Sequence, residues 1–137
     1  MKFNKNIQDL IPTMKKWRQT IHSFPEIAYE EYKTAEFIEK KLKEFGIKVI
    51  KNIGKTGLVG ILEGKKKSSK SIGLRADMDA LPMDEKTNLS YSSKNLGKMH
   101  ACGHDGHVTM LLGAAKILSE DKNFSGKVYF LSLIHIS

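Results

Sequence analysis

The chain has 137 residues, 40% of them hydrophobic, and carries a formal net charge of +8 at pH 7. Its length and apolar content suffice for one packed core, which argues against an extensively disordered protein. No apolar stretch approaches the roughly 20 residues that a membrane-spanning helix needs, so the sequence predicts no membrane protein.

The positive charge does not by itself indicate nucleic acid binding. The densest basic cluster, residues 65–70 (KKKSSK), contains no aromatic side chains of the kind that stack on bases in a single-strand binding surface. We therefore predict no nucleic acid partner and interpret residues 65–70 as an exposed loop between two strands. The single cysteine cannot form an internal disulfide and the N-terminus lacks a signal-peptide pattern, so we expect a cytoplasmic location.

Three helices are predicted from apolar residues that recur every three or four positions. The first covers residues 5–23 and is ended by Pro25. The second follows it and ends at Gly46, where a left-handed cap costs least. The third covers residues 106–119, with Asp105 as its N-cap.

Short β-branched segments between these helices predict strands. They cover residues 47–50, 58–62, 71–76 and 127–136. Helices that alternate with strands indicate an α/β fold with a mostly buried sheet, whose functional groups lie on loops at the strand ends.

A ten-residue segment, KMHACGHDGH, contains three of the five histidines and the only cysteine. In an extended segment, alternate residues point to the same side, so His100, Cys102 and His104 could converge on one metal ion. Thiolate and imidazole suit Zn²⁺ and are acceptable to other divalent transition metals. His107 alone is more typical of a hydrogen-bonded loop residue. Further ligands, most simply carboxylates, would have to come from elsewhere.

Two carboxylates follow a predicted strand in the segment RADMDALP. Asp77 and Asp79 could bind a metal or orient a metal-bound histidine, and each could instead cap backbone amides in a turn before Pro82. A different chemistry also stays open, in which Cys102 is a thiol nucleophile and a nearby histidine its base. Adjacent soft ligands favour the metal.

Three motifs carry a family resemblance: IHSFPEIAYEEYKTAEFIEKKL, IGLRADMDALP and GKMHACGHDGHVTMLLGAA. In this order they resemble the amidohydrolase branch of the M20 metallopeptidases, which includes hippurate hydrolase, N-acyl-amino-acid amidohydrolases and indoleacetyl-amino-acid hydrolases. The resemblance implies the start of a two-layer or three-layer α/β catalytic domain with a mixed sheet, like that of metallo-exopeptidases. It implies two divalent metal ions, Zn, Mn, Co or Ni, and hydrolysis of the amide bond of N-acylated amino acids by a metal-activated water.

The resemblance also implies roles for individual residues. Cys102 and His104 match metal ligands, and Asp79 matches an aspartate that supports the metal centre. Side chains that could support the ligands are Asp77, His100, Asp105 and His107. The family's HxxPE motif, for which we expect a structural role, is matched by His22, Pro25 and Glu26.

The last seven residues, LSLIHIS, depart from the family pattern. There the family continues into a glutamine-proline-alanine segment and two glutamates, one of them the general base. We interpret residues 1–130 as a truncated N-terminal part of the catalytic domain and residues 131–137 as read-through of a sequencing adapter. Such a fragment would be inactive alone and prone to aggregation, whereas the full-length protein could form a homodimer. If the chain is complete, the alternative is a non-enzymatic metal-binding or interaction module.

Overall fold

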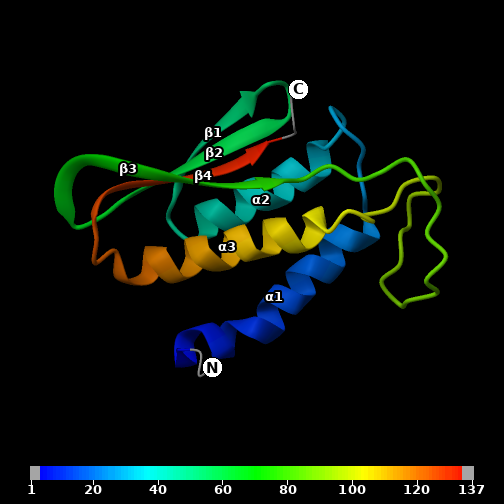
Figure 1. Cartoon of the computed structure of the whole chain (residues 1–137), viewed down its shortest axis with the longest axis horizontal. Coiled ribbons are helices and arrows are strands. Elements are labelled where there is room, and N and C mark those ends of the chain that lie inside the picture. The colour runs from blue at the N-terminus through cyan, green and yellow to red at the C-terminus, as the bar shows by residue number, and fades with distance from the viewer. Residues whose placement is uncertain (1–3, 134–137) are drawn as a thin grey trace.

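The computed structural model describes residues 4–133, which form helices packed on one side of a sheet (Figure 1). The elements in chain order are α1 (Lys5–Ser23), α2 (Tyr32–Glu44), β1 (Lys48–Ile53), β2 (Gly57–Glu63), β3 (Lys66–Asp77), α3 (His104–Asp121) and β4 (Ser125–Leu133). The predicted α/β class is confirmed, as are the bounds of the first helix. Gly46 has φ +78°, as the predicted left-handed cap requires. Within the described part of the chain, no helix is long and apolar enough to cross a membrane.

The sheet is mixed and has the strand order β1-β2-β4-β3. β1 pairs antiparallel with β2, and β2 antiparallel with β4. β3 and β4 are parallel, and α3 makes the crossover between them. As a result, the C-terminal end of β3 and the N-terminus of α3 lie close together at one end of the sheet.

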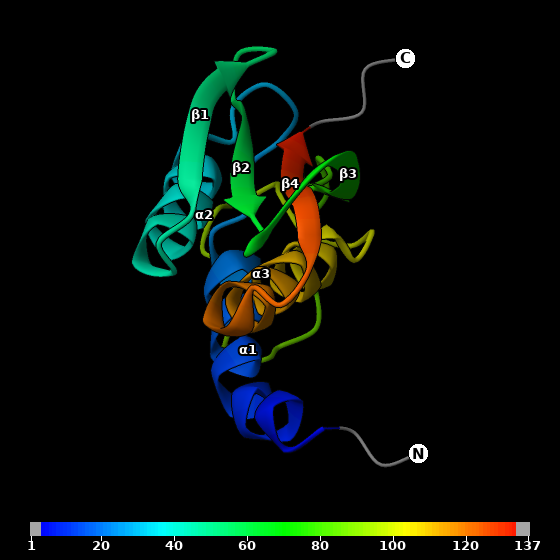
Figure 2. The same cartoon turned by 90° about the vertical axis from the view of Figure 1, so that its left-hand side faces the viewer.

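One hydrophobic core lies between the sheet and the helices. α2 and α3 pack on one face of the sheet, and α1 packs on α3 from outside (Figures 1 and 2). Fully buried side chains come from the sheet and from the two helices packed on it, for example Ile38 of α2, Leu112 of α3 and Phe130 of β4. Trp17 of α1 covers the outer side of this core, and its ring centroid lies 5.9 Å from that of Phe45.

The prediction of a mostly buried sheet is wrong for the edge strands. Residues 66–73 of β3 are exposed, and so is nearly all of β1. The helices cover only one face, and α2 and α3 are too narrow to shield both edges. Residues 66–70 were expected as a loop, but they belong to β3. The lysines of this segment are exposed, as predicted. They lie on an edge strand and not in a loop between strands.

The last described strand bears on the predicted adapter tail, residues 131–137. Leu131 and Leu133 continue β4 in register with Arg75 and Asp77 of β3. Residues 134–137, with His135, lie outside the described residues. The adapter origin of the tail therefore stays a prediction, whereas its first three residues complete a strand.

A buried glutamate, Glu31, joins the start of α2 to the turn between β1 and β2. Its Oε1 accepts a hydrogen bond from the Tyr29 N–H at 2.9 Å, and its Oε2 accepts one from the Thr56 hydroxyl at 2.6 Å. Burial raises the pKa of Glu31 above its ordinary value of 4.5 despite these hydrogen bonds.

This raised pKa predicts a pH dependence of stability. A carboxyl group whose pKa is higher in the folded state favours folding at low pH, and the contribution is lost as pH rises from 4.5 through the folded-state pKa. We expect the wild-type protein to lose stability relative to Glu31→Gln across this window. Urea unfolding of both proteins between about pH 4 and pH 8 measures the difference. Glu36→Gln, on the exposed side of α2, is the charge-matched control. Parallel stability curves for wild type and Glu31→Gln would contradict the prediction.

Candidate metal centre

The predicted site lies where β3 ends and α3 begins. Residues 78–103, here called the β3–α3 loop, connect the two elements (Figure 1). Although irregular, the loop is held by backbone hydrogen bonds: Ala80 N–H to the Glu26 carbonyl at 2.8 Å, and Lys94 N–H to the Ser23 carbonyl at 2.8 Å. A short bridge between Leu81 and Met99 closes its base. The loop is therefore anchored to α1 and to the segment before α2.

His104 is the first residue of α3 and contacts Asp79 directly. Its Nδ1 lies 2.9 Å from the Asp79 carbonyl oxygen and 3.0 Å from Asp79 Oδ1. Because both partners are acceptors, Nδ1 must carry the proton and donate it. The lone pair is then on Nε2, which can coordinate a metal. The side chain of His104 is 17% exposed, so it is not sealed in the core.

The predicted convergence of His100, Cys102 and His104 is wrong. The backbone bends at Cys102 and Gly103 instead of running extended, and Gly103 has φ +86°. As a result His100 is buried, whereas Cys102 is exposed and free. Among residues 4–133, no three histidine, cysteine or carboxylate side chains are grouped closely enough to hold a metal ion.

The same bend changes the start of α3. The helix begins at His104, two residues earlier than predicted, with Gly103 as N-cap. Asp105 therefore lies in the first turn and is not the N-cap. A left-handed glycine allows this early start, since it turns the chain into the helix without a side-chain cap.

The two carboxylates of the RADMDALP motif lie in different surroundings. Asp77 Oδ1 accepts hydrogen bonds from Arg75 Nη2 at 2.8 Å and Nε at 3.1 Å, within its own strand. Within residues 4–133, Asp79 contacts a histidine and Asp77 does not. The structure thus gives Asp79 the geometry for orienting His104, and Asp77 an ion pair at the strand end.

His100 is a buried histidine without a hydrogen-bond partner among the described residues. The residue is 4% exposed, and neither Nδ1 nor Nε2 has a hydrogen-bond partner. Burial lowers its pKa to about 4, so the imidazole is neutral at pH 7. A buried imidazole normally satisfies both nitrogens. His100 therefore fits a position where a further polar group, such as a metal or its bound water, comes close.

A second buried network, which the sequence did not reveal, lies beneath the loop. His22 Nδ1 is 2.8 Å from Asp105 Oδ2, and its Nε2 is 3.0 Å from Glu85 Oε1. Arg18 Nε also reaches Asp105 Oδ2, at 3.2 Å. Burial alone would raise the pKa of Asp105, but hydrogen bonds from His22 and the Gly106 N–H outweigh it and lower that pKa. No motif marks Glu85, which is 63 positions from His22 in the chain.

The remaining motif residues are placed as follows. Glu26 accepts hydrogen bonds from the backbone N–H groups of Lys33 and Thr34, at 3.1 and 2.6 Å, and so satisfies the start of α2. This agrees with the structural role expected of it. His107 is exposed, with its ring 5.6 Å from that of His104.

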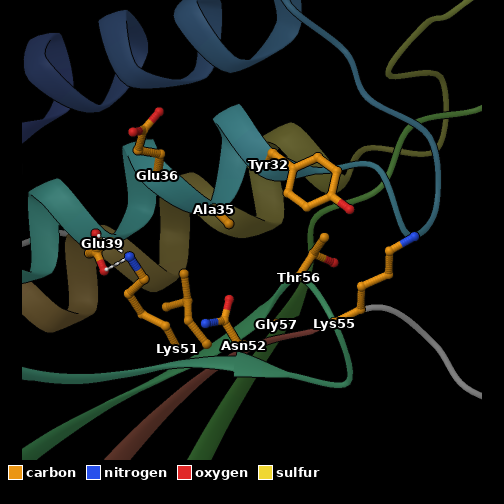
Figure 3. Close-up of a pocket in the computed structure, with 10 residues that line it drawn as sticks. Tyr32, Ala35, Glu36, Glu39, Lys51, Asn52, Lys55, Thr56 and Gly57 are labelled. Atoms are coloured by element: carbon orange, nitrogen blue, oxygen red, sulfur yellow. Dashed lines mark hydrogen bonds and ion pairs between the residues drawn. The ribbon is translucent and has the colours of Figure 1, made fainter.

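A separate cavity of about 250 Å³ lies between α2 and the β1–β2 hairpin (Figure 3). Figure 3 shows Glu39 and Lys51 facing each other at one end, with oxygen and nitrogen 3.2 Å apart. Glu39 also pairs with Lys43 at 3.7 Å, so its charge is compensated. No histidine or cysteine lines the cavity. It offers none of the soft ligands found at the β3–α3 end.

Comparison with known proteins shows which family the chain resembles. Residues 73–133 match the model of peptidase family M20/M25/M40. The chain is 55% identical over 126 residues to hippurate hydrolase of Campylobacter jejuni, covering 90% of this chain and 32% of that protein. It is 43% identical over 116 residues to an N-acyl-L-amino acid amidohydrolase of Geobacillus stearothermophilus, covering 84% and 31%. The chain thus spans about a third of the length of the curated relatives it matches.

A solved structure gives the same fold. The YXEP protein of Bacillus subtilis, described as a dinuclear metal binding peptidase of the M20 family, superimposes with a TM-score of 0.86. It is 34% identical in sequence, and the match covers 91% of this chain and 35% of that one. The resemblance to the amidohydrolase branch of the M20 metallopeptidases is confirmed.

Proposed function

We propose, from the premise that this chain corresponds to about a third of M20-family amidohydrolases, that it is part of a metal-dependent enzyme hydrolysing the amide bond of N-acylated amino acids. Relatives named for hippurate and for N-acyl-L-amino acids support this substrate class. The dinuclear metal binding described for the YXEP protein supports two metal ions. We further propose a cytoplasmic location, because Cys102 is free.

The observation that carries the proposal is the contact between His104 and Asp79. A carboxylate that accepts the Nδ1–H of a metal-binding histidine fixes its tautomer, orients the ring and makes Nε2 more basic. Asp79 does so with two acceptor oxygens, from its backbone and its side chain. A histidine held in this way is prepared for a metal rather than for a structural hydrogen bond.

Residues of this chain would supply part of one metal-binding wall. His104 would contribute Nε2, and the exposed Cys102 would contribute a thiolate from the bend two residues earlier. Bound divalent ions supply a Lewis acid for the scissile carbonyl and lower the pKa of water. Thiolate with imidazole is compatible with Zn, Co and Ni, and the family resemblance adds Mn. His100 and Asp105 offer further polar atoms behind these ligands.

The test is metal-dependent hydrolysis by the protein encoded by the complete reading frame around this chain. Removing metal with a chelator should abolish the release of benzoate from hippurate and of acetate from N-acetyl amino acids. Adding back Zn²⁺, Mn²⁺, Co²⁺ or Ni²⁺ one at a time should restore it and identify the metal. Hydrolysis that survives chelation, or no hydrolysis of any N-acyl amino acid by the metal-loaded protein, would contradict the proposal.

A further inference from the structure

His22 lies outside the predicted metal ligands, yet its ionisable side chain is almost completely enclosed near them. Its residue is 3% exposed, and it comes from the last turn of α1. Asp105 of α3 and Glu85 of the β3–α3 loop contact its two ring nitrogens, at 2.8 and 3.0 Å. The edge of the Tyr91 ring packs against it, with ring centroids 5.6 Å apart. One imidazole therefore joins three segments that are distant in sequence.

Both ring nitrogens of His22 lie within hydrogen-bond distance of a carboxylate oxygen, Asp105 Oδ2 on one side and Glu85 Oε1 on the other. Asp105 Oδ2 also accepts a hydrogen bond from Arg18 Nε at 3.2 Å. Such buried charged hydrogen bonds are strong when every member is paired, and costly when one is removed.

Each carboxylate paired with His22 organises part of the site. Glu85 also accepts hydrogen bonds from the Ser93 N–H at 2.9 Å and from the Thr87 hydroxyl, and so folds the middle of the β3–α3 loop around itself. Asp105 is the neighbour of His104 in the first turn of α3, and this turn has no side-chain cap. His22 thus connects the loop to the helix turn that presents the ligand.

We propose that His22 is a positioning residue for the metal centre. It holds Asp105, and with it the first turn of α3, so that His104 stays aligned with Asp79, while Glu85 holds the β3–α3 loop to the same turn. The inference rests on the proposed function, because it concerns a ligand of the same centre. It predicts that His22 affects metal binding without touching the metal.

The experiment measures Co²⁺ binding by the protein encoded by the complete reading frame around this chain, because the chain spans only about a third of its relatives. A thiolate-to-cobalt charge-transfer band reports coordination by Cys102 and needs no enzymatic activity. We expect His22→Ala to weaken Co²⁺ binding about 10- to 100-fold, the range seen when outer partners of metal ligands are removed. His22→Gln keeps one donor for a carboxylate, so its loss should be smaller. If His22→Ala does not fold, His22→Gln still tests whether His22 affects Co²⁺ binding.

A matched control separates positioning from stability. Leu10 is buried in the core from the same helix, and Leu10→Ala should destabilise the chain without touching the network. Circular dichroism identifies conditions in which all variants are folded. Weaker binding in the His22 variants alone supports the inference. Unchanged binding in His22→Ala, or equal losses in His22→Ala and Leu10→Ala, overturns it. A wild-type protein without the band instead counts against the proposed metal centre, and the inference falls with it.

Discussion

Replacing His104 by Gln is expected to lower metal affinity more than about 100-fold, beyond the effect of losing a group that only supports a ligand. His104 already donates its Nδ1–H to Asp79, so Nε2 is its only free nitrogen. Glutamine offers no comparable lone pair at that place. Co²⁺ titration of the protein encoded by the complete reading frame, followed by absorbance, measures the loss.

Two further variants test the roles of Cys102 and Asp79 in the same metal-binding measurement. Cys102→Ser should remove the thiolate-to-cobalt band, because Cys102 is the proposed thiolate ligand. Asp79→Asn should fall between wild type and His104→Gln, at about a 10- to 100-fold loss, since it leaves the ligand but weakens its orientation. His107→Gln, at an exposed position on the next turn of α3, is the control. Binding by His104→Gln as tight as by wild type would contradict the assignment of His104 as a ligand.

Phe130→Ala should have the largest effect on stability. Phe130 is fully buried in β4, between Gly60 of β2 and Leu74 of β3. Truncating a buried Phe costs about 3–5 kcal/mol, from lost apolar burial and the cavity left behind. Small domains have only about 5–15 kcal/mol of unfolding free energy in total. Urea unfolding followed by circular dichroism should therefore show a much lower midpoint.

The neighbouring residue provides the control for this substitution. Tyr129 points to the opposite face of the sheet and is only partly buried. Tyr129→Ala should cost clearly less than Phe130→Ala, because the helices cover one face only. Equal losses would contradict a core confined to the helical side.

Most of the fold could be predicted from apolar spacing. The apolar residues that recur every three or four positions predict both ends of α1, and three of them, Leu10, Trp17 and Ile21, are buried in the structure. Burial of the sheet was overestimated, because β-branched residues such as Ile72 are 58% exposed on an edge strand. The local sequence does not state which strand will lie at an edge. That depends on pairings between distant segments.

Part of the candidate site could also be predicted from the sequence, and part of it depends on tertiary packing. Asp79 and His104 could be predicted because each lies in a motif with chemically distinctive residues. The bend at Gly103 could not, since alternation along an extended chain gave no reason to expect it. His22, Asp105 and Glu85 meet only through the tertiary packing of α1, α3 and the β3–α3 loop. Their pairing spans 83 and 63 positions, so spacing in the sequence carries no signal of it.

The parallel β3–α3–β4 unit has a consequence for mechanics. Asp79 lies two residues after the end of β3, His104 is the first residue of α3, and the two are joined by direct hydrogen bonds within this unit. A hinge motion elsewhere in a larger protein would carry the pair along without separating it. If other parts of such a protein closed around a substrate, the groups opposite His104 would change. The tautomer and ring orientation of His104 would stay as Asp79 sets them.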